Sequence, residues 1–188
     1  MPYVSRADLG HAFCSYCGHP PTGVWRARPH RVCMRCEMGV VLQAPAGAAP
    51  RYNDPFVIVD RQLAVQAVSR YAEVALSVEE PAGLDAPLEE FLVCKNGGHA
   101  GGELAALVEL VFAGAEPSNR LELRTTANPE IRLQGRVTTC GPPPAALLVL
   151  TPLAAPATAA RNGRPATNGN RAHGGQVPSQ PQDADWRN

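Results

Sequence analysis

The sequence predicts an α+β protein, in which a small module with four cysteines precedes a domain of strands and short helices. Three observations predict this. Two Cys-x-x-Cys pairs lie near the N-terminus, apolar runs of strand length fill the middle, and the C-terminal stretch is dense in Pro, Gly, Asn and Ala. We expect the module at 1–42, a linker at 43–53, the α+β domain at 54–153 and a disordered tail at 154–188.

Composition points to a globular protein without a membrane segment. Of the 188 residues, 45% are hydrophobic and 18% are charged. Apolar runs fall short of the roughly 18 to 20 residues that cross a bilayer, and the N-terminus lacks the apolar region of a signal peptide. The sequence therefore predicts a cytoplasmic protein, where thiols stay reduced and clustered cysteines favour metal over disulfides.

The first cysteine pair is Cys14 and Cys17, and the second is Cys33 and Cys36, with fifteen residues between the pairs. Zn²⁺ prefers four soft ligands in a tetrahedron, and a tight turn with two intervening residues presents both sulfurs of a pair to one ion. Gly18 follows the first pair, where the chain reverses with positive φ. The stretches CSYCGH and CMRCEMG resemble the knuckles of zinc ribbons, and the resemblance covers residues 11–40.

Four cysteine ligands would close the coordination shell, which predicts structural rather than catalytic zinc. Several alternatives stay open. One cysteine pair could act as a redox dithiol, the metal could be iron, and a nearby histidine could replace a thiolate. These histidines are His11, His19 and His30. Val24 and Trp25 are candidates either for packing within the module or for contact with a partner.

The elements of the α+β domain follow from periodicity and turn signals. Ser69 is suited to cap a helix. Four apolar residues at i, i+3, i+4 and i+7 mark the longest helix. The stretch NGGHAGG at 96–102, which precedes that helix, is expected to be irregular. We expect strands at 56–59 and 63–68, helices at 70–76, 87–92 and 103–113, and strands at 121–124, 131–137 and 145–150.

The resulting order is β-β-α-α-α-β-β-β over residues 54–153. This order, and the stretch DPFVIVDRQLAVQAVSRYAEVAL at its start, resemble the PAS family. The resemblance implies a five-stranded antiparallel sheet with short helices on one face, and a cavity that holds a ligand in some members. It also implies homodimerisation through the sheet or the flanking helices.

The sequence does not identify a PAS ligand or its binding residues. In flavin-binding relatives the reactive cysteine lies in Asn-Cys-Arg-Phe-Leu-Gln, which the surroundings of Cys94 do not match, so Cys94 is predicted to be a small buried residue. Haem-binding relatives use a histidine on the long helix, but His99 precedes that helix. Cys140 has no neighbour that would activate it. Walker, GxSxG and HExxH motifs do not occur, so we expect no enzyme activity.

Charge is distributed unevenly along the chain. Residues 1–50 carry a net charge of +3 and residues 51–154 a net charge of −5. The basic residues of the first segment are Arg6, Arg26, Arg28, Arg31 and Arg35. In the predicted tail, Trp186 could anchor a partner, and three arginines could contact acidic surfaces: Arg161, Arg164 and Arg171.

These observations favour a cytoplasmic signalling or regulatory protein. The PAS-like domain would sense a ligand or dimerise, and the ribbon would contact a protein partner. The alternative is a transcription-associated factor whose basic ribbon touches DNA or RNA polymerase through Arg26, Arg28, Arg31 and Arg35.

Overall fold

The structure is a computed structural model that describes residues 10–21, 31–95, 100–114 and 120–154. These residues all belong to one compact unit, Met1–Pro156. Its elements in chain order are β1 (His11–Cys14), β2 (Val41–Ala44), β3 (Phe56–Val59), β4 (Val65–Val68), α1 (Arg70–Leu76), α2 (Glu80–Gly83), η3 (Leu88–Glu90), β5 (Leu92–Cys94), α3 (Ala100–Phe112), β6 (Arg120–Thr125), β7 (Arg132–Cys140) and β8 (Ala145–Pro152). The predicted tail, except Ala154, lies outside the described residues.

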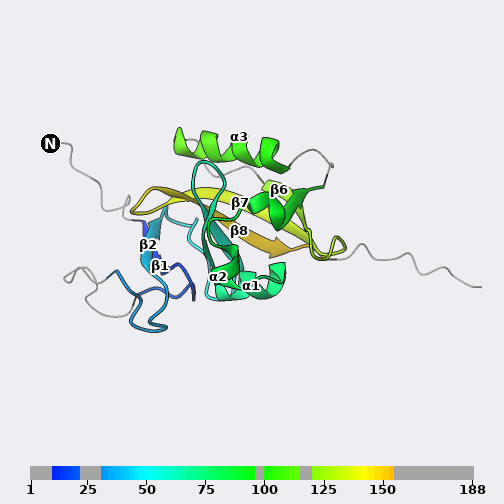
Figure 1. The fold of residues 1–188 in the computed structure, drawn as a ribbon. Coiled ribbons are helices and arrows are strands. Elements are labelled where there is room, and N and C mark those ends of the chain that lie inside the picture. Colours follow the sequence, from blue (N-terminus) through cyan, green and yellow to red (C-terminus); the bar gives the residue numbers. More distant parts are fainter. Residues whose placement is uncertain (1–9, 22–30, 96–99, 115–119, 155–188) are drawn as a thin grey trace, which may run out of the picture. The chain divides into compact units, whose positions relative to one another are not determined.

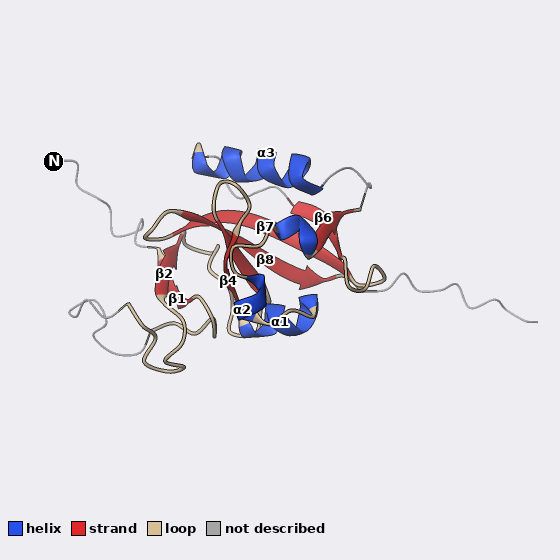
Figure 2. Ribbon diagram, viewed as in Figure 1, coloured by secondary structure: helices blue, strands red, loops and turns tan. Residues whose placement is uncertain are grey.

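A curled antiparallel sheet with few helices forms the main domain (Figure 2). Its strand order is β4-β3-β8-β7-β6-β5. The expected five strands are therefore corrected to six, because β5 pairs with β6 at the sheet edge. Sequence reasoning missed β5 because it is only three residues long and directly follows a helical turn.

The helices also differ in detail from the expected ones. The helix expected at 87–92 is the short 3₁₀ turn η3, and α3 begins at Ala100, within the stretch expected to be irregular. Helix α2 occupies Glu80–Gly83, where no helix or strand was expected, and it holds Pro81 in its first turn. Proline is compatible with the first turn of a helix, because the N–H that it lacks has no partner there.

One face of the sheet packs against the helices and forms the larger apolar core. Leu104 and Val108 of α3 and Leu76 of α1 join Leu148 and Leu150 of the central strand β8 in one buried cluster. Helix α3 lies along the sheet (Figure 1), in contact with β5, β7 and β8. The apolar spacing predicted for this helix is therefore confirmed as its core-facing side.

Ser69 links the first hairpin to α1. Its side chain is fully buried, and its Oγ accepts hydrogen bonds from the N–H of Ala72 at 3.3 Å and of Phe56 at 2.9 Å. The first of these caps the helix, as the sequence predicts, and the second holds the start of β3 against the helix.

Replacing Ser69 with alanine is expected to lower the free energy of unfolding by about 2 to 4 kcal/mol, because two buried N–H donors lose their acceptor. Urea denaturation followed by circular dichroism measures the change. Ser77→Gly is the matched control, since Ser77 ends the same helix at φ 55 and glycine relaxes that conformation. A loss below about 0.5 kcal/mol in Ser69→Ala would contradict this account.

The opposite face of the sheet is covered in part by the cysteine module. Phe13 and Leu42 of the β1–β2 hairpin share a buried cluster with Phe56, Ile58 and Leu147 of the sheet. The rings of Phe13 and Phe56 meet edge to face, with centroids 5.6 Å apart. Both faces of β3 are therefore buried, which explains its unbroken apolar sequence.

The segment expected to be a linker, 43–53, takes part in this packing. Strand β2 extends to Ala44, and Ala48 is buried. Gln43 and Gly141 exchange two backbone hydrogen bonds of 2.7 and 3.0 Å, which join the module to the turn after β7. The small residues there allow close packing rather than flexibility, so the expectation of a linker is corrected at these positions.

Candidate metal centre

Two similar tight turns carry the four cysteines. Cys14 ends β1 and Cys17 lies in the turn that follows, while Cys33 and Cys36 lie in a turn ahead of β2. In the first turn the Gly18 N–H donates to the Cys14 carbonyl at 3.0 Å. In the second turn Glu37 donates to Cys33 in the same way at 2.8 Å.

In both turns the residue after the second cysteine has positive φ. Gly18 has a φ of 70°, as the sequence predicts, and Glu37 has a φ of 58°. That backbone conformation turns the chain away from the sulfurs, and it costs a non-glycine residue about 1 kcal/mol or more. Nothing in the local sequence indicates that Glu37 adopts this conformation.

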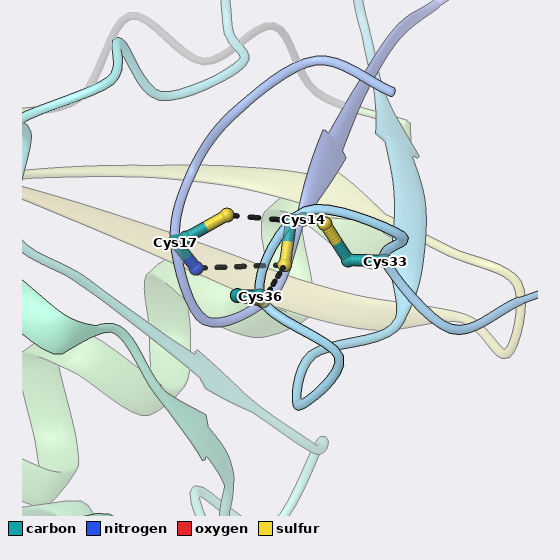
Figure 3. A group of neighbouring side chains, drawn as sticks. All are labelled: Cys14, Cys17, Cys33 and Cys36. Atoms are coloured by element: carbon teal, nitrogen blue, oxygen red, sulfur yellow. Dashed lines mark hydrogen bonds between the residues drawn. The ribbon is translucent and has the colours of Figure 1, made fainter. Parts of the chain in front are cut away.

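The four sulfurs point toward one another (Figure 3). Cys14 Sγ lies 3.6 Å from Cys36 Sγ, Cys17 Sγ lies 3.9 Å from Cys33 Sγ, and all four sulfurs lie within 4.8 Å of one another. A tetrahedron of sulfurs about 2.3 Å from a central zinc ion has edges of about 3.8 Å. All four cysteines are free, so this group of soft donors has the size and shape to hold a metal ion.

Backbone N–H groups surround the sulfurs. The N–H groups of Tyr16 and Cys17 both lie 3.4 Å from Cys14 Sγ, in a geometry that stabilises a thiolate. Burial nevertheless raises the pKa of the Cys14 and Cys17 thiols, since a thiolate loses solvation there. Burial acts on Cys36 too, but hydrogen bonds led by the N–H of Gly39 lower its pKa to about 7. A cation would supply the remaining stabilisation of four thiolates.

Sequence reasoning missed Gly39, which lies against the first turn. A Cβ atom at this position would lie 2.5 Å from Cys14 Sγ and 2.7 Å from the Tyr16 nitrogen. The Gly39 carbonyl accepts the Cys33 N–H at 2.8 Å, and the next residue, Val40, exchanges hydrogen bonds with Ser15. The glycine that follows the second pair in CMRCEMG was the available signal for this close approach of the two turns.

The other candidate residues that the structure describes do not join the sulfur cluster. His11 is exposed at the start of β1. The imidazole of His19 packs on the Tyr52 ring, with centroids 3.8 Å apart, and burial lowers its pKa. Cys94 and Cys140 are buried in the cores, and burial raises the pKa of both thiols, that of Cys140 to about 12.

Several residues singled out in the sequence lie outside the described residues, and their roles stay predictions. They are Arg6, Val24, Trp25, Arg26, Arg28, His30, His99, Arg161, Arg164, Arg171 and Trp186.

The first cysteine turn faces the main domain. The Tyr16 carbonyl accepts the N–H of Arg70 at the start of α1 at 2.9 Å, and the Tyr16 hydroxyl donates to Glu73 at 3.2 Å. Gly18 lies beside Phe56 of β3, where a Cβ atom would be 3.4 Å from the ring. This turn is therefore fixed to the sheet domain.

The second cysteine turn presents apolar side chains to solvent. Met34 is 79% exposed and Met38 is 63% exposed, with Val32 and Val40 also exposed beside them. We call these four residues the knuckle surface. Met38 and Val40 also line a groove of about 430 Å³, together with Leu42 of the module. Exposed apolar side chains grouped in this way are typical of interaction sites.

No helix in the described part of the chain is both long and apolar enough to span a membrane. No family model and no curated protein matches the chain. Among solved structures, the chain is similar to PAS domains. With the PAS domain of a protein from Desulfitobacterium hafniense it shares 19% identity, covering 54% of this chain and 93% of that one, at a TM-score of 0.42.

Two further PAS domains give comparable values. For that of nitrogen regulation protein NR(II) from Vibrio parahaemolyticus, identity is 15%, coverage is 53% of this chain and 89% of that one, and the TM-score is 0.41. For that of an HTR-like protein from Haloarcula marismortui, identity is 11%, coverage is 53% and 86%, and the TM-score is 0.39.

Proposed function

We propose that the chain is a non-catalytic regulatory protein whose metal module contacts a protein partner through the knuckle surface. The sheet domain, which resembles PAS domains in its sequence pattern, would sense a ligand or dimerise. The observation that carries the proposal is the difference in exposure between the two cysteine turns. One turn is fixed to the sheet domain through Tyr16, and the other exposes Met34 and Met38.

Zinc is the ion we propose for the four cysteines, because four thiolates at tetrahedral spacing are the ligand set of structural zinc sites. Cys14, Cys17, Cys33 and Cys36 would hold it. The ion would tie the two turns together, so that ligand binding or dimerisation in the sheet domain could alter how the knuckle surface is presented. Four protein ligands complete its coordination and leave no position for a substrate, which supports a non-catalytic role.

The alternative from sequence, contact with DNA or RNA polymerase, has narrower support. Arg31 and Arg35 are exposed beside the knuckle surface and add positive charge to it. All four side chains of that surface are nevertheless apolar, and phosphate contacts depend on charge. This composition favours a protein partner.

Changing Met34 and Met38 together to glutamate is expected to reduce retention of a cellular partner at least tenfold, because two carboxylates would enter a desolvated apolar contact. The measurement is affinity purification with immobilised protein, with extracts treated with nuclease and partners quantified by mass spectrometry. Melting temperatures should stay within about 2 °C of wild type, since both side chains are exposed.

Val74→Glu is the matched control, because Val74 is 80% exposed but belongs to α1 and not to the knuckle surface. It should retain the same partner as wild type. The proposal is contradicted if the Met34→Glu, Met38→Glu variant retains the same proteins as wild type in the same amounts. A partner lost on nuclease treatment would favour nucleic acid instead.

A further inference from the structure

Basic side chains gather on the outer face of β5, β6 and β7. Leu123 and Leu133 of these strands are buried in the core under the helices, so the residues that alternate with them point to the other side. The charged residues on that side are Lys95, Arg120, Glu122, Arg124, Arg132 and Arg136. We call the five basic residues among them the basic face.

The concentration of positive charge is local. Residues 51–154 have a net charge of −5 and only eight basic side chains, yet five of the eight belong to the basic face. Glu122 is the single carboxylate on the outward positions of these strands in the described part of the chain. If charged residues were distributed by chance over an acidic domain, positive and negative side chains would be mixed on these strands.

Strand register places arginines directly opposite arginines. Arg124 pairs with Arg132 and Arg120 pairs with Arg136 across β6 and β7. Directly opposite residues have Cα atoms about 4.5 to 5.5 Å apart, and like charges in such positions destabilise a sheet. Such pairs are expected to lower the stability of the free protein, and an anionic partner would relieve the repulsion.

Carboxylates of the protein itself neutralise only part of this charge. Glu122 forms salt bridges with Lys95, at 2.9 Å, and with Arg132. Within the described ranges, Arg120, Arg124 and Arg136 have no carboxylate within 4.0 Å. Arg136 donates to the carbonyls of Gly47 and Ala48, and the buried Nε of Arg124 has no hydrogen-bond partner among the residues that the structure describes.

The shape of the face decides between classes of anionic partner. The planar guanidinium group can form two parallel hydrogen bonds with either a carboxylate or a phosphate, so this geometry does not distinguish the two. The outward positions of β5, β6 and β7 hold no aromatic side chain on which bases could stack. The face of a curled sheet of several strands presents neither a helix nor a two-stranded ribbon to a DNA groove. A second copy of the chain is disfavoured, because a two-fold contact through this face would bring arginines against arginines.

We propose that the basic face binds an acidic segment of a partner protein, whose Asp and Glu carboxylates pair with Arg120, Arg124 and Arg136. An extended segment suits the surface, because its side chains four residues apart are separated by about 13 to 14 Å, as are Arg120 and Arg124 of β6. The knuckle surface belongs to a different part of the fold, so this proposal does not depend on the proposed function.

The test is fluorescence anisotropy with a labelled peptide of about ten residues that alternates Glu and Ser, at low and physiological salt. Replacing Arg120 and Arg124 together with glutamine is expected to weaken peptide binding at least tenfold. The melting temperature of the Arg120→Gln, Arg124→Gln variant should be no lower than that of wild type, because like-charge repulsion is relieved. The matched control is Arg31→Gln with Arg35→Gln, which removes two exposed charges from the knuckle region and should change affinity less than about twofold.

Three results would overturn the proposal. Wild type could fail to bind the peptide at low salt, or the Arg120→Gln, Arg124→Gln variant could bind as tightly as wild type. Tighter binding of a single-stranded or duplex DNA of matched charge, lost in the same variant, would make the basic face a nucleic-acid surface instead. Partner retention by the knuckle surface is unaffected by any of these outcomes, so the two proposals fail separately.

Discussion

Removing metal from the four cysteines is expected to lower the melting temperature of the whole described unit by more than about 10 °C. The reason is that the module covers one face of the sheet. Without the ion, the two cysteine turns beside the β1–β2 hairpin are no longer held together. The buried cluster that Phe13 and Leu42 form with the sheet then opens. Each large apolar side chain that is re-exposed costs about 1.5 to 3 kcal/mol, and Phe56, Ile58 and Leu147 are among them.

Circular dichroism with and without a strong zinc chelator measures the melting temperature, and native mass spectrometry counts the metal and the copies per particle. One zinc ion per chain is expected. Cys33→Ser should reproduce the effect of the chelator, whereas Cys94→Ala is the control, since Cys94 lies in the helix-covered core and should leave metal content unchanged. The zinc site would be excluded if reduced protein held no stoichiometric metal, or if the chelator left the melting temperature unchanged.

Replacing Gly39 with alanine is expected to weaken metal binding about 10- to 100-fold, although no ligand is changed. The added methyl group would meet Cys14 Sγ at 2.5 Å and the backbone of Tyr16, both of which are fixed by the fold. The two cysteine turns would have to separate, and the sulfurs would lose their tetrahedral spacing. Competition with a chromogenic zinc chelator measures the affinity.

Gly102→Ala is the control for this substitution. Gly102 is exposed within α3, and a Cβ atom there would meet nothing within 4 Å. Alanine should leave zinc affinity unchanged and stabilise the protein by about 0.5 to 1 kcal/mol, because glycine is a poor helix former. Equal zinc affinity in Gly39→Ala and wild type would show that the turns can move apart without loss.

Local sequence patterns were sufficient for most elements of the sheet domain. Ser69 predicted the start of α1, and the apolar spacing around Leu104 and Val108 predicted the core side of α3. These features depend on interactions within three or four residues, which a sequence displays directly. The boundary of α3 and the three-residue strand β5 were wrong or missed, because short segments are decided by their neighbours in space.

The candidate site divides in the same way. Two Cys-x-x-Cys pairs predicted that four sulfurs lie close together, since the turn geometry of each pair is local. Gly39 could not be recognised from spacing alone. Its role depends on the approach of two turns that are separated by many residues along the chain.

By itself, the sequence determined that four thiols gather near the N-terminus and that strands and short helices follow. Only the tertiary structure decided which face of the sheet the cysteine module covers, which turn exposes Met34 and Met38, and that Arg124 lies opposite Arg132. The physical reason is that docking and strand register are set by contacts between distant segments. A register shift of one residue would have placed those arginines in the core.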